Sequence, residues 1–433
     1  MPHDAYLTTP PSAASARLAG QGLDTCLVDT ADGFEPWLQV VTRAFLGSER
    51  SPEEVASARE RTPYRRKTGV YDAAAAMPDW PVATIASWVA ELTVPGGGAV
   101  PASAISSVTV SPTHRRRGIA RVLLEEELRL AAASGLPLSV LTVSESTIYG
   151  RYGFGAAAAA ASLVLDVKRA AWAGPTPGGR VDFVSRERWR DVVAAVHERA
   201  RGRDAGELDM PAGHFDLFAG TLPESKDAGA KRAVQYADEA GEVRGAALYT
   251  LKENDDDFTK ATVRLEYLAA ETPDAYAALW RFFVELDLVA EVRASELSVD
   301  EPLLWMISDQ RAARVTVSDH HYVRVLDVTA ALSARRYGAA GRMLLEVDDP
   351  LGYAAGTWLL EVDDEGVGTV SPAAGAPDDA VRVRLGVTEL SAAYLGGVSL
   401  ATLADAGRVQ TTDAALAARV FGWHRPPRLS FWY

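Results

Sequence analysis

One stretch, residues 105–155, limits what this chain can fold into more than any other. It reads ISSVTVSPTHRRRGIARVLLEEELRLAAASGLPLSVLTVSESTIYGRYGFG. Val108 and Val110 alternate with polar residues, which is typical of a strand that buries one face. Pro112 follows almost at once and ends this strand, because proline cannot donate a hydrogen bond to a neighbouring strand. The strand therefore stops at a fixed point, shortly before three consecutive arginines.

A helix and a second strand are predicted after the arginines. Apolar residues recur at helical spacing from Ile119 to Ala131, and they give this helix one buried side. Gly135, a residue type that often follows the last turn of a helix, marks its predicted end. Residues 137–143 are apolar and predict a strand buried on both faces. Strand, helix and strand in this order predict a parallel α/β unit.

The turn between the first strand and the helix has the composition of an anion site. The first N–H groups of a helix lack internal partners, and the helix dipole makes that end partly positive. Gly118 has no Cβ to block a ligand, and Ala120 keeps the next turn small. Arg115, Arg116 and Arg117 add charge and forked donors. The composition predicts a pyrophosphate cradle. Taken alone, the arginines are equally compatible with an ordinary basic surface cluster.

The same spelling occurs a second time in a different context. Residues 335–340 read RRYGAA and share the pattern R-x-x-G-x-A with the first copy. They follow a predicted helix over 330–334, so their amides would not point into a crevice at the end of a strand. We therefore reject this second copy as a phosphate site.

In its context, the stretch 108–120 resembles the acetyl-coenzyme A motif of the GCN5-related N-acetyltransferases (GNATs), which is Q/R-x-x-G-x-G/A after a strand. The longer text around it, with SESTIYGRYGFG, resembles a narrower group, the Eis (enhanced intracellular survival) acetyltransferases. The later text YAALWRFFVELD at 276–287 and VRVLDVTAALSARRYG at 323–338 is similar to the same group. The resemblance implies acetyl-CoA as co-substrate, a homohexamer, and acetylation of amines, notably on aminoglycosides.

The length and the resemblance together predict three domains. A chain of 433 residues is too long for one hydrophobic core. Residues 1–22 are rich in Pro, Ala and Ser and predict a disordered tail. A GNAT domain is expected over 23–172, and a GNAT-like domain without the cofactor motif over 173–322. A sterol-carrier-protein-like domain, ending in the active site, is expected over 323–433.

Two local secondary-structure assignments are made within these domains. The alanine run 156–161 favours a helix by propensity, but the alternating residues 163–167 follow it, so a strand is predicted. Residues 392–406 predict a helix in the third domain.

The motif assigns residues to acetyl-CoA. Val108 and Val110 would meet the amides of the pantetheine arm as an added strand does, and Ser144 and Glu145 would contribute backbone contacts. His114 either joins the phosphate contacts or is a solvated loop residue. The full predicted set is Val108, Thr109, Val110, Arg115, Arg116, Arg117, Gly118, Ile119, Ala120, Arg121, Ser144 and Glu145.

Acetyl transfer from a thioester to an amine needs a proton donor for the leaving group and a proton acceptor for the amine. Tyr149 is the predicted donor, because it follows the end of the second strand, where the thioester would lie. In the Eis family the tyrosine of IYGR(F/Y)G has this role, and residues 148–153 match that pattern. The alternative is a core tyrosine with a bonded hydroxyl. Tyr152 is expected to serve ring packing.

The predicted base lies at the last residue. The resemblance implies that the terminal α-carboxylate, here that of Tyr433, is buried in the active site and accepts the proton. Such a carboxylate has an ordinary pKa of about 3.5, and burial among Phe431, Trp432 and the first domain is expected to raise it. The alternative is a merely structural terminus. Phe45 and Glu49 are guesses for the substrate channel. The histidines outside the first domain show no metal-ligand spacing, so no metal is expected.

Charge and cysteine content narrow the function class. The net charge of −14 argues against nucleic-acid binding. It reads either as a solubility feature or as a preference for cationic amines. The single cysteine, Cys26, fits a reducing cytosol. No apolar run approaches the roughly 18 residues of a membrane span, and the sequence predicts a cytoplasmic protein without a membrane partner.

The leading hypothesis is an acetyl-CoA-dependent N-acetyltransferase of broad specificity that acts on small cationic amines, with aminoglycosides acetylated at several sites. A peptide or protein Nα/Nε-acetyltransferase is the alternative within enzymes, and an open groove instead of an enclosed acidic pocket would favour it. A lipid-binding carrier with a vestigial acetyltransferase fold is the alternative from another class. The intact cradle and Tyr149 argue against the carrier.

Overall fold

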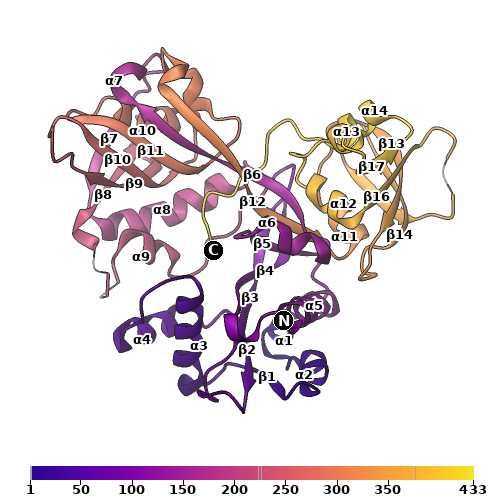
Figure 1. Ribbon diagram of the computed structural model, residues 1–433. Helices are drawn as coiled ribbons and strands as arrows, with labels where there is room; N and C mark the ends of the chain where they lie inside the picture. Colours follow the sequence, from indigo (N-terminus) through magenta and orange to yellow (C-terminus); the bar gives the residue numbers. More distant parts are fainter. Residues whose placement is uncertain (1, 223, 226, 376) are drawn as a thin grey trace.

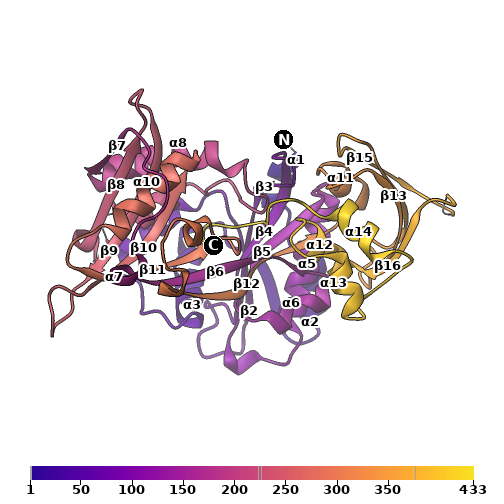
Figure 2. The ribbon, with the colours of Figure 1, turned by 90° about the horizontal axis from the view of Figure 1, so that it is seen from above.

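The chain folds into three lobes around a long central sheet. The structure is a computed structural model that describes residues 2–222, 224–225, 227–375 and 377–433. Figure 1 shows the N-terminal lobe in indigo and violet, the central lobe in magenta to orange, and the C-terminal lobe in yellow. Seen from above in Figure 2, the central and C-terminal lobes flank the N-terminal lobe on opposite sides.

The N-terminal lobe supplies the first strands of the sheet. Its strands are β1 (Leu23–Leu27), β2 (Arg66–Asp72), β3 (Ala83–Thr93), β4 (Ala99–Val110) and β5 (Leu138–Thr142). Its helices are α1 (Pro2–Thr8), α2 (Ser12–Ala19), α3 (Ala31–Ala44), α4 (Pro52–Arg61), α5 (Ile119–Ala133) and α6 (Ser146–Tyr149), with the short 3-10 turns η1 (Pro112–His114) and η2 (Gly150–Tyr152).

One part of the central lobe, residues 180–297, repeats the order of strands and helices found in residues 23–142. The strands of the whole lobe are β6 (Gly155–Asp166), β7 (Arg180–Val184), β8 (Lys231–Ala237), β9 (Val243–Lys252), β10 (Ala261–Ala270), β11 (Val289–Leu297) and β12 (Ala313–Val325). Its helices are α7 (Val167–Ala170), α8 (Arg186–Arg201), α9 (His214–Ala219) and α10 (Pro273–Val284), with 3-10 turns η3 (Ala228–Ala230), η4 (Pro302–Trp305) and η5 (Gln310–Ala312).

The N-terminal and central lobes exchange strands in the middle of one sheet. The sheet has the order β1-β2-β3-β4-β5-β12-β6-β11-β10-β9-β8-β7. β6 follows β5 in the chain but pairs with β11 of the central lobe, while β12 follows β11 and pairs with β5 of the N-terminal lobe. β6 and β12 also pair with each other over ten registered positions, so they join the lobes rigidly. As a result, β12 and β6 lie side by side between β5 of the N-terminal lobe and β11 of the central lobe.

The C-terminal lobe has its own sheet. Its strands are β13 (Gly341–Asp348), β14 (Gly356–Val362), β15 (Gly368–Pro372), β16 (Val381–Gly386) and β17 (Val409–Thr411), in the order β15-β14-β13-β16-β17. Its helices are α11 (Val328–Ser333), α12 (Val387–Ala393), α13 (Leu400–Asp405) and α14 (Ala414–Phe421). The single helix predicted over 392–406 is wrong, because the chain turns at Gly396, where φ is +81°, between α12 and α13. The predicted boundary at 322/323 falls inside β12.

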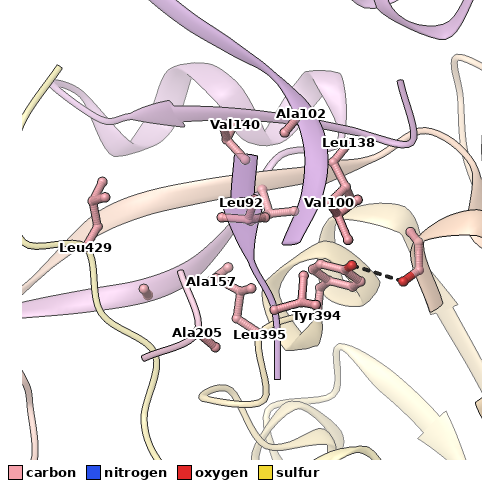
Figure 3. Close-up of a cluster of buried hydrophobic side chains, with 14 of the residues drawn as sticks. Leu92, Val100, Ala102, Leu138, Val140, Ala157, Ala205, Tyr394, Leu395 and Leu429 are labelled. Carbon is pink, nitrogen blue, oxygen red and sulfur yellow. Dashed lines mark hydrogen bonds between the residues drawn. The ribbon is translucent and has the colours of Figure 1, made fainter. Parts of the chain in front are cut away.

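All three lobes meet in one hydrophobic core. Figure 3 shows side chains from β3, β4 and β5 packed beside residues of the C-terminal lobe and the last segment of the chain. Tyr394 is fully buried there, and its hydroxyl donates to the carbonyl of Ala331 at 3.0 Å. The contributing buried residues include Leu92, Val100, Ala102, Leu138, Val140, Ala157, Ala205, Leu395 and Leu429. Because the lobes share this core, their relative positions are fixed at the site described below.

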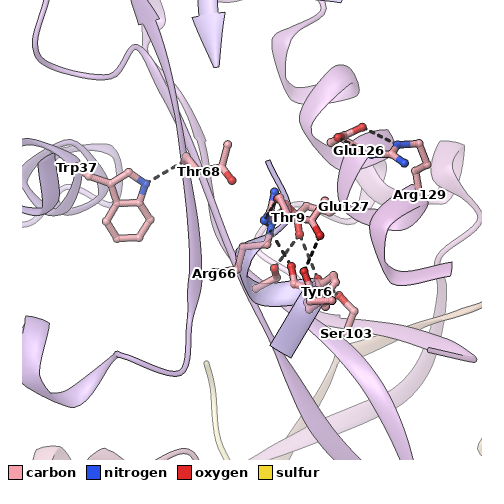
Figure 4. A network of polar contacts seen from close by, with 11 residues as sticks. Tyr6, Thr9, Trp37, Arg66, Thr68, Ser103, Glu126, Glu127 and Arg129 are labelled. Carbon is pink, nitrogen blue, oxygen red and sulfur yellow. Dashed lines mark hydrogen bonds and ion pairs between the residues drawn. The ribbon is translucent and has the colours of Figure 1, made fainter. Parts of the chain in front are cut away.

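The prediction of a disordered tail over residues 1–22 is wrong. α1 and α2 fold against the N-terminal lobe, and Tyr6 is fully buried. The Tyr6 hydroxyl lies 2.7 Å from Ser103 Oγ and donates to Glu127 at 3.1 Å, as Figure 4 shows. Glu127 also pairs with the buried Arg66 at 3.1 Å. Composition misled here because a few buried side chains, Tyr6 with its satisfied hydroxyl and Ala14 and Leu18 of α2, are enough to hold two short helices.

The other local predictions for the motif region agree with the structure. The alanine run lies in β6, as the alternating residues after it predicted. The rejected second copy follows α11, and its first arginine, Arg335, is buried and donates to the carbonyls of Tyr394 and Phe421. That arginine stabilises the C-terminal lobe and does not face solvent.

Candidate active site

β4 and β5 are parallel neighbours that part toward their carboxyl ends. Their register runs from Ala102 paired with Leu138 to Ile105 paired with Leu141, although β4 continues to Val110. A bulge in β4 accompanies this separation: Ser107 has φ of +53°, and the register against β3 shifts between Thr84 and Ala86. Bulges of this kind bend a strand and redirect its groups. The unpaired part of β4 leaves backbone groups free for a ligand that enters between the strands.

The start of α5 forms an open anion cradle at the end of β4. Gly118 is the N-cap residue with φ of +79°, and no side chain caps the helix start. A Cβ built on Gly118 would meet nothing within 4 Å, so the space in front of the helix is open. The free N–H groups at this end therefore face a volume that a phosphate can occupy.

The arginines around the cradle divide into two pairs. Arg115 and Arg116 are exposed, and neither has an ion-pair partner within the described residues. Arg117 turns away and donates to the carbonyl of Gln21 at 2.9 Å. Arg121 pairs with Glu125 at 2.7 Å on the surface of α5. Free cations and open amides together fit the diphosphate of acetyl-CoA, with Arg115 and Arg116 as the residues that would hold it.

The corresponding helix of the central lobe lacks this cradle. α10 connects the parallel strands β10 and β11 as α5 connects β4 and β5. Its start is closed: Thr272 caps it by accepting a hydrogen bond from the Ala275 amide at 3.1 Å, and Pro273 has no N–H to offer. Asp274 adds a negative charge in the first turn. This helix start is therefore unsuited to a phosphate.

Tyr149 lies at the end of α6, directly after β5. It is 6% exposed, and its ring packs edge-on against Phe154 with centroids 6.1 Å apart. Burial raises the pKa of its hydroxyl, and the negative charge of Glu145 acts in the same direction, while a hydrogen bond with Ser144 opposes both. The hydroxyl therefore stays protonated at neutral pH.

β12 and the C-terminal lobe together hold the turn that follows Tyr149. Arg324, fully buried on β12, donates to the carbonyl of Tyr152 at 2.7 Å and pairs with Asp349 at 2.8 Å. Thr388 of α12 donates to the carbonyl of Gly150 at 3.2 Å. The turn after the predicted acid is thus fixed by segments more than 150 residues away in sequence.

The last twelve residues of the chain form an arm that crosses to the centre of the molecule. Figures 1 and 2 show it leaving α14 and ending between the N-terminal and central lobes. The Arg428 amide donates to the Ala205 carbonyl at 2.7 Å. Buried Glu207 accepts from the amide of Ser430 at 3.2 Å and from its Oγ at 3.0 Å. Phe431 is 2% exposed. The central lobe therefore anchors the arm.

The carboxyl group of Tyr433 lies at the end of β5. Thr142, the last residue of β5, donates through its Oγ1 to an oxygen of that group at 2.9 Å. The Tyr433 ring meets Trp88 edge-on, with centroids 5.2 Å apart, and its hydroxyl lies 3.1 Å from His321 Nε2. Within the described residues, no Lys, Arg or His nitrogen lies within 4 Å of the carboxyl group. It thus sits beside the opening between β4 and β5 with a free oxygen.

The three terminal rings differ in exposure: Phe431 is buried, Tyr433 is partly buried and Trp432 is exposed. Trp432 is 50% exposed, and its ring lies tilted by 45° against that of His320, with centroids 5.0 Å apart. The nearby histidines are uncharged at neutral pH, since burial lowers the pKa of His321 to about 3 and that of His214 to about 4. In the described part of the chain, no group of three or more His, Cys, Asp or Glu is arranged to hold a metal ion.

A cavity of about 700 Å³ has the last two residues, Trp432 and Tyr433, in its wall. It lies between the N-terminal and central lobes, with walls from α3, α4, the start of β2, the β4 bulge and α9. Phe45, a guess for the channel, lies in its wall, whereas Glu49 does not. The cavity reaches both the β4 bulge and the last two residues, so one molecule in it can contact both.

Sequence reasoning missed several residues of this region. Thr142 was part of an apolar strand, and nothing in its surroundings marked it as a partner of the last residue. Arg65 and Lys67 line the cavity. Arg65 comes just before β2 and Lys67 is its second residue, and no recognisable motif surrounds them. Of the predicted residues, Thr109 points away from the opening, because its side chain is buried against Thr84 with 2.6 Å between the two Oγ1 atoms. His114 lies 3.0 Å from Asp72.

Family comparisons agree with this architecture lobe by lobe. Residues 29–157 and residues 206–325 each match a family described as an acetyltransferase (GNAT) domain. Residues 328–430 match a sterol carrier protein domain. Within the described residues, no helix has the length and apolar character needed to cross a bilayer.

Similar proteins cover nearly the whole chain. An uncharacterized N-acetyltransferase of Streptomyces avermitilis is 34% identical over 402 residues, which are 90% of this chain and 92% of that protein. The N-acetyltransferase Eis of Mycobacterium tuberculosis is 34% identical over 342 residues, 76% of this chain and 79% of Eis. The crystal structure of Eis1 from Mycobacterium abscessus is 26% identical, with a TM-score of 0.79 over 95% of this chain and all of Eis1.

The relatives, the paired GNAT lobes and the C-terminal sterol-carrier lobe lead to one conclusion. This chain belongs to the Eis family of GCN5-related N-acetyltransferases.

Proposed function

We propose that this enzyme transfers the acetyl group of acetyl-CoA to a primary amine bound in the 700 Å³ cavity, with Tyr149 as proton donor and the Tyr433 carboxylate as proton acceptor. The observation that carries the proposal is the 2.9 Å hydrogen bond from Thr142 to the Tyr433 carboxyl group. It fixes a carboxylate at the end of β5, in a residue that lines the cavity.

The residues proposed to bind acetyl-CoA are those of the anion cradle at the start of α5. Acetyl-CoA, when bound, supplies the activated acetyl group as a thioester. Arg115, Arg116 and the first amides of α5 would bind its diphosphate, and the unpaired backbone of Val108 and Val110 would bind its amide-bearing arm. Ser144 and Glu145, both exposed after β5, lie on the opposite side of the same opening.

The group proposed to bind the amine substrate is the Tyr433 carboxylate. One oxygen of Tyr433 is occupied by Thr142, which leaves the other to accept a hydrogen bond from a substrate ammonium. Removing that proton makes the amine nucleophilic, and a positioned carboxylate can take it directly or through a water molecule.

Tyr149 supplies the proton on the other side. Its raised pKa keeps the hydroxyl protonated, as a donor requires. Because a phenol is a weaker acid than the thiol it must form, whose reference pKa is about 8.5, proton delivery has to accompany departure of the leaving group.

Aminoglycosides, the acceptors that the resemblance implies, are not the acceptors that the cavity wall favours. Within the part of the chain that the structure describes, Arg50, Arg61, Arg65 and Lys67 line it, and its acidic side chains are Glu54 and Glu224. The homohexamer stays a prediction from the resemblance. The peptide acetyltransferase and the lipid carrier remain alternatives, and the open cradle at Gly118 favours an acyl-CoA enzyme over a carrier.

An acetyl-CoA consumption assay with a panel of primary amines tests the proposal. We expect release of free coenzyme A that needs both the enzyme and an amine, with a monoacetylated product detectable by mass spectrometry. Binding of acetyl-CoA without turnover of any primary amine would contradict it, and retained lipid with no acetyl-CoA binding would favour the carrier.

Replacement of Gly118 by valine is expected to raise the Kd for acetyl-CoA at least about tenfold. A β-branched residue at φ of +79° is strained by about 1–3 kcal/mol, and its side chain would fill the space in front of the free amides. Isothermal titration calorimetry measures the Kd directly.

The matched control for this substitution is Gly135→Val at the other end of α5. Gly135 has φ of +74° and equally empty surroundings, so valine there strains the same helix without entering the cradle. If the two variants lose acetyl-CoA affinity equally, strain in α5 and not the cradle explains the loss.

A further inference from the structure

The charges in the cavity wall are unequally matched. Arg50 pairs with Glu54 at 3.4 Å, and Arg61 lies 3.8 Å from Glu224, so both acidic side chains in the wall are next to an arginine. Arg65 and Lys67 have no carboxylate within 4 Å in the described part of the chain. Counted over the described residues, the wall therefore carries two cations more than acidic side chains.

Arg65 is held in place by aromatic neighbours, and its guanidinium group has donors left for a ligand. Its carbon Cζ lies 4.6 Å from the Trp88 ring centroid, and its Nε donates to the Tyr64 hydroxyl at 3.1 Å. No acceptor within the described residues takes the four remaining N–H groups. A stacked guanidinium with a free fork of donors is suited to a carboxylate or phosphate.

Lys67 is a buried cation on the same wall. It is 8% exposed, and its Nζ donates to the carbonyls of Thr62 at 2.6 Å and Arg65 at 3.2 Å, which leaves one N–H free. Its Nζ also lies 5.4 Å from the Phe34 ring centroid. Burial and the charge of Arg65 lower the pKa of Lys67 to about 8, so it is mainly charged at pH 7.

The cavity wall also has apolar side chains beside these cations. Phe34, Trp37, Leu38 and Trp432 contribute to its wall. Trp88, against which Arg65 stacks, meets the Tyr433 ring at 5.2 Å, so a single ring separates the guanidinium from the last residue. One small molecule can therefore reach Arg65 with one end and the Tyr433 carboxylate with the other.

We propose that the acceptor is a monoamine with an aromatic or otherwise apolar body and an anionic oxygen group, a carboxylate or a phosphate, which Arg65 and Lys67 bind. This substrate class rests on the acetyl transfer proposed above. A polycation is attracted by the Tyr433 carboxylate but repelled by Arg65 and Lys67. An amine with an anionic end is attracted by the carboxylate through its ammonium group and by the two cations through its anionic group.

A matched set of amines tests the proposal. The probes are benzylamine, para-(aminomethyl)benzoate, para-(aminomethyl)phenylphosphonate and kanamycin, each assayed for coenzyme A release with the full-length enzyme. We expect a kcat/KM for at least one anionic probe about 10- to 100-fold above that for benzylamine, the effect of one or two charge-assisted hydrogen bonds. The carboxylate and phosphonate probes distinguish the two anions. Kanamycin is expected to be the poorest acceptor.

Two variants locate the anion site. Arg65→Gln and Lys67→Met are each expected to raise KM for the preferred anionic probe about tenfold or more, with KM for benzylamine and Kd for acetyl-CoA changed less than threefold. Arg65 makes no backbone contact through its guanidinium, so Arg65→Gln keeps the test valid if Lys67→Met fails to fold. Arg43→Gln is the control, because this exposed arginine on α3 lies outside the cavity wall.

Each outcome bears on a different claim. Kanamycin preferred over every anionic probe would overturn the substrate class, as would equal losses for benzylamine and the anionic probe in Arg65→Gln. In both cases acetyl transfer itself would stand. Absence of coenzyme A release with all four amines, despite acetyl-CoA binding, would instead remove the acetyl transfer on which this inference rests.

Discussion

Conversion of the Tyr433 carboxyl group into an amide is expected to lower kcat by about 10²- to 10⁴-fold, the scale of general base catalysis. The amide keeps the ring, its contact with Trp88 and an oxygen for Thr142 to donate to. It removes only the negative charge and the basic oxygen. Semisynthesis of the last residues by protein ligation gives this variant, and steady-state coenzyme A release measures it. A short C-terminal extension is expected to have an effect at least as large.

The control is Tyr433→Phe, which keeps the carboxylate and loses the hydroxyl beside His321. We expect it to retain kcat within about tenfold of the parent, since only one hydrogen bond with a net value of about 1 kcal/mol is lost. Thermal unfolding midpoints of both variants show whether the arm still docks. An amidated enzyme with full activity would contradict the role of the carboxylate.

Replacement of Tyr149 by phenylalanine is expected to cut kcat by about 10²-fold or more while the Kd for acetyl-CoA stays within threefold. The ring is 6% exposed and packs on Phe154, and phenylalanine preserves that contact while it removes the proton. Single-turnover kinetics separate the chemical step from binding.

Tyr152→Phe is the matched control in the same turn. Tyr152 is also buried, and it is its carbonyl, not its hydroxyl, that accepts the hydrogen bond from Arg324. The substitution is therefore expected to leave kcat within threefold of the parent. If Tyr149→Phe is as active as Tyr152→Phe, then Tyr149 is a core tyrosine and the proton reaches the leaving group by another route.

The cofactor end of the site was largely readable in the sequence. A strand that ends at a proline, an unhindered glycine and an apolar helical stripe are all local signals, and β4, Gly118 and α5 follow them closely. The rejection of the second arginine-glycine copy was equally local, because α11 comes before Arg335. The fold family was predicted from the same stretch of sequence, because the family motifs occur in the same order along this chain.

The amine end was not readable from the residues themselves. Arg65 and Lys67 stand out only because no carboxylate of the described residues lies within 4 Å of them in the folded cavity, and short-range spacing carries no such information. The terminal carboxylate was predicted through family resemblance alone. Its contact with Thr142 joins positions 291 residues apart, which no local periodicity can indicate.

The sequence by itself determined the α/β units, the cradle at the start of α5 and the family, because each depends on residues that are close together in the chain. Only the tertiary structure decided the exchange of β6 and β12, the docking of α1 and α2, and the arrival of the Tyr433 carboxylate at the end of β5. These features depend on which surfaces bury each other across hundreds of residues, and that is a property of the packed molecule.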